Sequence, residues 1–177
     1  MVKNKAPLLS SLLLVLLLSG CMGVKHGGGT TPAGKLMEEF FVKPGVMQYF
    51  IKPLSWKMEE SKSLVTTDFT FRDSAGVKSP VTCNFTVVDF PADSVQVGES
   101  STAFKAKTST LFEEKNDGLP RYRYSVQMPI ASFQQLIQAG APLQLISPSR
   151  NGKRERKTAL PSGKTRKRFK KLALTFF

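Results

Sequence analysis

From about residue 35 onward, the chain is dominated by short segments in which apolar and polar residues alternate. Residues 65–72 are typical, since every second side chain is apolar or β-branched: Val65, Thr67, Phe69 and Phe71. A period of two is expected of strands with one buried face. Similar segments are 81–90, 104–112 and 121–128, with shorter candidates at 46–51, 143–146 and 172–176. Gly- and Asp-containing turns at 73–76 and 115–118 favour antiparallel hairpins.

One helix interrupts the strands. In the segment 130–139, Phe133, Leu136 and Ile137 recur at helical spacing, and Gly140 and Pro142 follow where a helix would end. About seven strands with regular turns and one short helix predict a mainly β domain. We expect a single antiparallel β-sandwich, immunoglobulin-like or similar, with the helix around 130–139.

The N-terminus has a different pattern. Lys3 and Lys5 precede an apolar run over residues 8–18, broken only by two serines. This is the layout of a secretory signal peptide, expected here over residues 1–20. A helix that crosses a membrane needs about 20 apolar residues, and Gly20 and further glycines follow too soon.

The end of the apolar run is Leu18-Ser19-Gly20-Cys21. This tetrapeptide resembles the lipobox of bacterial lipoproteins. The resemblance implies that Cys21 receives a diacylglycerol and, after cleavage, becomes the first residue of the mature chain. Two or three acyl chains hold a protein firmly on a bilayer. In enteric-type bacteria an Asp after this cysteine retains lipoproteins at the inner membrane, so Met22 implies the periplasm-facing side of the outer membrane.

Residues 21–34 are rich in glycine and are expected to form a flexible tether. The remaining residues, 35–177, are enough for one domain with one core. If Cys21 is acylated, Cys83 is the only other thiol and no intramolecular disulfide can form. Cys83 lies on the apolar face of its predicted strand, so we expect a buried core residue.

No catalytic, metal or nucleotide site is recognisable. The only histidine, His26, lies in the tether, and the acidic pairs show no ligand spacing. Ser162-Gly163-Lys164-Thr165 imitates the end of a phosphate-binding loop, but Thr158 stands where that loop requires glycine. We therefore expect a non-enzymatic protein with no cofactor, no metal and no nucleotide ligand.

The formal net charge is +13, and the excess is concentrated at the C-terminus. Residues 150–177 contain eleven Lys and Arg but one acid, Glu155. The basic segment, 150–171, has two interpretations: a solvated hairpin loop before a last strand at 172–176, or a surface that binds an anion or partner. Its candidate residues are Arg150, Lys153, Arg154, Arg156, Lys157, Lys164, Arg166, Lys167, Arg168, Lys170 and Lys171.

Three functions remain open from the sequence. The first is a membrane-anchored envelope lipoprotein whose non-catalytic β-sandwich serves as an accessory or assembly component of a larger envelope complex, such as secretion or conjugation machinery. The second is direct binding of anionic lipid, lipopolysaccharide or glycan through the basic segment. The third is an envelope hydrolase that uses carboxylates not marked by any motif. Export excludes nucleic acid as the partner of the basic segment.

Overall fold

The computed structural model describes residues 36–61, 63–98, 103–116, 118–149 and 151–177. The signal peptide and tether predicted for residues 1–34 lie outside these residues. The strands are β1 (Met37–Lys43), β2 (Val46–Met58), β3 (Leu64–Ser74), β4 (Val77–Lys78), β5 (Val81–Val88), β6 (Ser94–Val97), β7 (Phe104–Lys107), β8 (Ser109–Asn116), β9 (Leu119–Met128), β10 (Leu143–Ile146) and β11 (Arg156–Pro161). The helices are α2 (Ile130–Ala139) and α3 (Gly163–Phe176).

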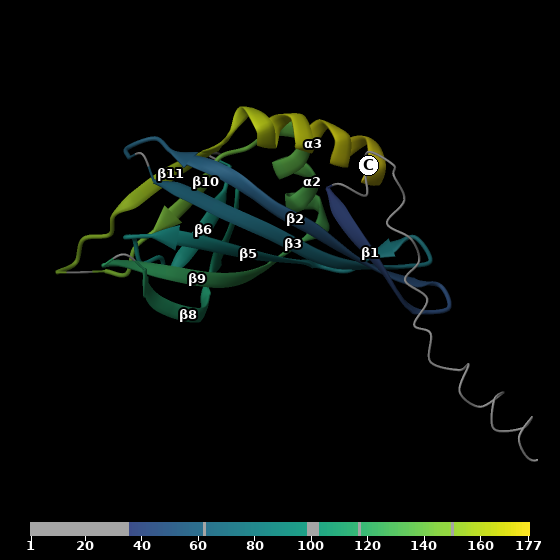
Figure 1. The fold of residues 1–177 in the computed structure, drawn as a ribbon, viewed down its shortest axis with the longest axis horizontal. Helices are drawn as coiled ribbons and strands as arrows, with labels where there is room; N and C mark the ends of the chain where they lie inside the picture. The colour runs from purple at the N-terminus through teal and green to yellow at the C-terminus, as the bar shows by residue number, and fades with distance from the viewer. Residues whose placement is uncertain (1–35, 62, 99–102, 117, 150) are drawn as a thin grey trace, which may run out of the picture.

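The strands form one antiparallel sheet that curls into a nearly closed barrel (Figure 1). The order along the sheet is β7-β6-β10-β11-β2-β3-β5-β9-β8, with β1 on β2 and β4 on β3. The mainly β, antiparallel class is as predicted. A sandwich of two packed sheets is not confirmed, because every strand pairing belongs to the same continuous sheet.

The barrel approaches closure because the two end strands, β7 and β8, are consecutive in the chain. Only Thr108 separates them. The Thr108 backbone N–H donates to the carbonyl of Asp93 at 2.8 Å, and its hydroxyl donates to the carbonyl of Ala92 at 2.8 Å. One extended segment therefore pairs with β6 before Thr108 and with β9 after it.

The core lies on the concave face of the sheet and under the helices. Alternate residues of the long strands are buried there, as the period of two predicted: Ile51, Trp56, Val65, Phe69, Phe71, Val81, Cys83, Phe85, Tyr124, Val126 and Met128. The predicted burial of Cys83 is confirmed. Burial raises the pKa of the Cys83 thiol well above its ordinary value, so the group is protonated and unreactive.

Helix α2 is confirmed with the bounds that the sequence predicted. Gly140 ends it in the left-handed conformation at φ 62°, a geometry that glycine adopts without strain. Phe133 is fully buried and packs on Phe69 and Phe71, with ring centroids 5.1 and 5.8 Å apart. This helix therefore covers the aromatic part of the core.

The last element corrects the prediction of a loop followed by a strand at 172–176. Residues 163–176 form α3, and 172–176 are helical. Its buried positions are Thr165, Phe169 and Leu172, with Phe176 packed against the core. This spacing places one apolar stripe along a helix, and burial of that stripe outweighs the short alternation of Leu172, Leu174 and Phe176. The stripe docks on β2, where Phe169 contacts the buried Trp56 at 5.6 Å between ring centroids.

Candidate functional site

The structure divides the predicted basic segment into two groups. Lys153, Arg154, Arg156 and Lys157 lie in the β10–β11 loop and on β11, and the other six described residues lie on α3. Arg150 and the predicted lipidation site, Cys21, lie outside the described residues. The two groups differ in what surrounds their charges.

In the loop group, most of the charges are engaged within the domain. Arg154 pairs with Asp93 at 3.4 Å, and Arg156 donates to the side-chain oxygen of Gln144 at 3.1 Å. Lys157 pairs with Glu155 at 3.3 Å, and its Nζ lies 4.5 Å from the centre of the Phe90 ring. The acids Asp93 and Glu155 thus offset part of the positive charge of this group, and Arg156 is held by a neutral amide.

The same loop borders an open pocket at one end of the barrel. The pocket has a volume of about 620 Å³ and is lined by Asp89, Phe90, Pro91, Tyr122, Ser147, Pro148, Lys153, Arg154, Glu155 and Lys157. Its lining combines two acids with three basic residues and includes the Lys157–Glu155 ion pair. No strong preference for one sign of charge follows from this lining.

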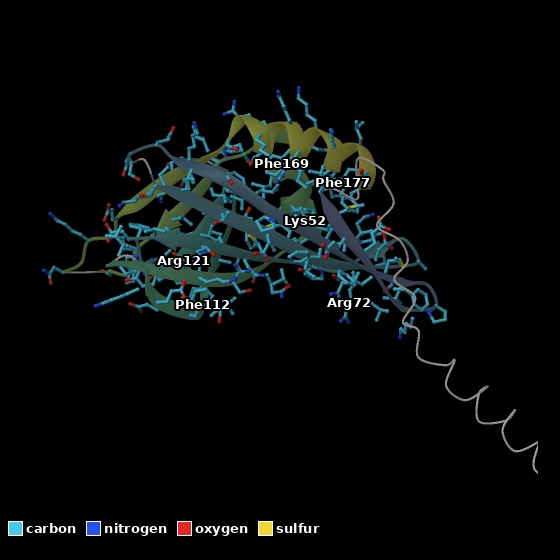
Figure 2. All side chains as sticks on the ribbon, viewed as in Figure 1. Lys52, Arg72, Phe112, Arg121, Phe169 and Phe177 are labelled. Atoms are coloured by element: carbon cyan, nitrogen blue, oxygen red, sulfur yellow. The ribbon has the colours of Figure 1, made fainter. Side chains whose placement is uncertain are left out.

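Helix α3 presents a different arrangement, which we call the basic face. It consists of five exposed residues: Lys164, Arg166, Lys167, Lys170 and Lys171. The sixth cation, Arg168, is half-buried and donates to the backbone carbonyl of Pro53 at 3.1 Å. Within the part of the chain that the structure describes, no acidic side chain lies within ion-pair distance of the basic face. Figure 2 shows nitrogen-tipped side chains extending from α3 away from the sheet.

The charges of α3 work against the helix itself. The first turn contains no acid and carries Lys164, although the N-terminal end of a helix dipole repels positive charge. Lys167 and Lys171 are four residues apart, as are Arg166 and Lys170, and such like-charged pairs destabilise a helix by a few tenths of a kcal/mol each, about 0.2–0.5. A sequence selected only for stability would place acids at some of these positions.

The buried side of α3 compensates for this repulsion and holds the basic face in place. Ser162 caps the helix, because its hydroxyl accepts from the backbone N–H of Thr165 at 3.2 Å. The buried hydroxyl of Thr165 donates to the carbonyl of Ser55 at 2.7 Å and accepts from the N–H of Ser55 at 3.1 Å. The tetrapeptide Ser162-Gly163-Lys164-Thr165, which resembles the end of a phosphate-binding loop, is thus the start of this docked helix.

Leu174 lies within the basic face. It follows Lys170 and Lys171 by one helical turn and Lys167 by two, and 89% of its surface is exposed. The C-terminal Phe177, which contacts Phe133, is also partly exposed. The outward side of α3 therefore combines five cations with one fully projecting apolar side chain.

Over the described residues, no group of three or more His, Cys, Asp or Glu is arranged to hold a metal ion, and no buried side-chain nitrogen or oxygen lacks a hydrogen-bond partner. None of the described helices is long and apolar enough to cross a membrane. Comparisons with protein families, with characterised proteins and with solved structures find no match to this chain.

Sequence reasoning identified the members of the basic face but missed that a helix places them together. The spacing of Thr165, Phe169, Leu172 and Phe176 could have revealed this helix. Sequence reasoning also missed a polar network on the convex face of the sheet. There the buried carboxylate of Asp68 accepts from Arg123 at 2.6 Å and from Asn84 at 2.8 Å.

Proposed function

We propose that this protein is a lipid-anchored, non-enzymatic component of the bacterial envelope that binds an anionic surface through the basic face of α3. The observation that carries the proposal is a docked helix with five exposed cations and no acid among them. Elsewhere in the described domain, cations such as Lys52, Lys78 and Arg121 have acidic partners. Other exposed cations that have no acidic partner among the described residues, such as Lys43, Lys57 and Lys105, lie on separate strands, whereas the basic face gathers five of them on one helix.

The energetics favour an extended partner. Each Lys or Arg close to an anionic surface contributes on the order of 1 kcal/mol, so five such residues bind a surface strongly although none would do so alone. The five cations lie between Lys164 and Lys171, over about 10 Å of helix, and this spread suits a surface or a polymer better than a single small anion. Exposed charges are screened by salt, so binding should weaken as ionic strength rises.

The experiment compares two triple variants with the same formal change of charge. One reverses the basic face: Lys167→Glu, Lys170→Glu and Lys171→Glu. The control reverses three exposed lysines on β7 and β8: Lys105→Glu, Lys107→Glu and Lys115→Glu. We expect the first variant to lose at least about 100-fold in affinity for a soluble polyanion such as heparin, from about 3 kcal/mol of lost attraction. Equal losses in both variants would reduce the effect to net charge and overturn the proposal.

The anchor is tested separately. Cys21→Ala should release the protein from the membrane fraction, and radiolabelled palmitate should enter the native chain but not the variant. Lipidation at Cys21 is supported by the sequence that precedes it, Leu18-Ser19-Gly20. Failure of labelling in the native chain would remove the proposed anchor and the outer-membrane location that depends on it.

A second candidate function, as an accessory component that contacts another envelope protein, is favoured by strand β1. This strand pairs only with β2 among the described strands. It exposes three consecutive apolar residues, Phe40, Phe41 and Val42, with Phe41 exposed over 66% of its surface. Edge strands of this kind are sites where another chain can add a strand. If so, Phe40→Ser with Phe41→Ser should dissociate a membrane complex that survives reversal of the basic face.

A further inference from the structure

We infer that the anionic surface is the phospholipid bilayer that carries the anchor, and that α3 lies along it with Leu174 inserted between the head groups. This inference rests on the proposed function, because it needs the basic face to bind an anion. It adds the identity of the partner, the orientation of the domain and the residue that enters the membrane.

The position of Leu174 is the first argument. A soluble polyanion or an acidic polypeptide binds cations, and an isolated leucine among them adds nothing to that attraction. A bilayer offers phosphate groups and, a few Å deeper, hydrocarbon. Helices that lie in this interface place lysines at the level of the head groups and apolar side chains below them. With Lys167, Lys170 and Lys171 beside it, the 89% exposed Leu174 matches that order.

The place where the chain enters the domain is the second argument. The carbonyl of Leu36, the first described residue, accepts from the backbone N–H of Lys52 at 2.9 Å. The carbonyl of the next residue on β2, Pro53, accepts from Arg168 of α3 at 3.1 Å. The segment that leads back to Cys21 therefore joins the domain directly beside α3. Figure 1 shows the same neighbourhood, with the start of β1 close to the C-terminal end of α3.

The length of that segment permits the arrangement. Cys21 and Leu36 are 15 residues apart, and a chain of this length spans at most about 50 Å. Since the entry point adjoins α3, a much shorter span suffices for the anchor and the helix to meet one bilayer. Strands β8 and β9 then face away from the membrane, because Phe112 and Arg121 lie on the side of the barrel opposite α3 (Figure 2).

The test uses the full lipidated chain in liposomes whose acyl chains carry bromine, which quenches nearby tryptophan fluorescence. Leu174→Trp places the probe on the basic face. The matched control is Leu111→Trp, an exposed leucine on β8. The native tryptophan, Trp56, is fully buried and supplies a constant background in both variants.

In brominated phosphatidylglycerol liposomes we expect about a twofold loss of emission from the probe at position 174 and none from the probe at 111. In brominated phosphatidylcholine liposomes, which lack net charge, the quenching at 174 should disappear although the anchor is unchanged. Quenching at 174 no greater than at 111 would overturn the bilayer as partner, and equal quenching at 174 in both lipids would overturn its anionic head groups as the ligand of the basic face.

Heparin binding separates this outcome from failure of the proposed function. If the probe at 174 is unquenched while the native chain still binds heparin through the basic face, the partner is an acidic protein or polymer and only the present inference fails. If heparin binding is also indifferent to Lys167, Lys170 and Lys171, the proposed function fails with it.

Discussion

Thr165 and Ser55 exchange two hydrogen bonds although 110 residues separate them in the sequence. One hydroxyl, on α3, both donates to the backbone carbonyl of Ser55 and accepts from its N–H. Ser55 belongs to β2, the central strand that also carries Trp56. This contact joins the last helix to the middle of the sheet and fixes the direction of the basic face.

Thr165→Val keeps the shape of this side chain but removes both hydrogen bonds. We expect the free energy of unfolding to fall by about 2 kcal/mol, because the partly buried N–H of Ser55 is left without a partner, although its carbonyl still accepts from the N–H of Ser162 at 3.2 Å. Urea unfolding measures this free energy, and we expect its dependence on urea concentration to be unchanged. The control is Thr175→Val on the exposed side of α3, where the hydroxyl bonds only to the carbonyl of Lys171. Similar losses in the two variants would show that the contact with Ser55 contributes little.

Lys164→Glu should raise stability and weaken binding at the same time. An acid in the first turn of α3 interacts favourably with the helix dipole and can pair with Arg168 four residues later, together worth about 0.5–1 kcal/mol. The same change removes a cation and adds an anion on the basic face, which should lower affinity for anionic vesicles by at least about tenfold. Thermal unfolding and vesicle sedimentation measure the two effects, with Lys105→Glu as control. A variant both less stable and equally bound would contradict our account of α3.

Arg123→Gln should destabilise the barrel by about 2 kcal/mol. The side chain of Asp68 is only 5% exposed, so removing Arg123 leaves a buried carboxylate without its cation. Because Arg123 is itself partly exposed, the loss of stability is smaller than for a fully buried pair. Arg121→Gln is the control, because its partner Glu114 is well exposed and such pairs contribute at most about 1 kcal/mol. Adding Asp68→Asn to the Arg123 variant should recover part of the loss, and no recovery would argue against the ion pair as the cause.

Cys83 should resist thiol reagents as long as the domain is folded. Burial raises the pKa of its thiol, so the reactive thiolate is scarce at pH 8, and the side chain is 2% exposed. We expect modification by a maleimide to be on the order of a thousandfold slower than in urea, since it requires unfolding. Mass spectrometry follows the labelling. Rapid modification without denaturant would show that β5 opens easily.

The sequence predicted where α2 ends because Gly140 and Pro142 act locally, each on its own backbone. It predicted a single strand over 104–112, whereas the chain divides at Thr108. That division depends on hydrogen bonds to Ala92 and Asp93, and no local pattern reports them. Closure of the sheet, and hence a barrel in place of a sandwich, follows from these distant contacts.

The site was predictable in composition but not in geometry. Lysines and arginines after residue 150 were evident, yet Arg154 pairs with Asp93, a residue that only the fold brings near it. The five residues of the basic face share one surface because α3 is a helix. The sequence analysis interpreted this segment as a loop and a strand, because Leu172, Leu174 and Phe176 alternate with polar or small residues over a short distance. Three alternating apolar residues are compatible with a helix as well as with a strand, and packing against distant residues decides between the two.

Because α3 follows all the described strands in the sequence and supplies Phe169 to the core beside Trp56, the domain cannot complete its folding until α3 has been synthesised. Contacts between such distant parts of a chain also form slowly. Until α3 is made, a domain built in this way lacks the side chain that covers Trp56. For the exported protein proposed here, the late helix would keep the polypeptide in the unfolded condition that passage through a translocation channel demands.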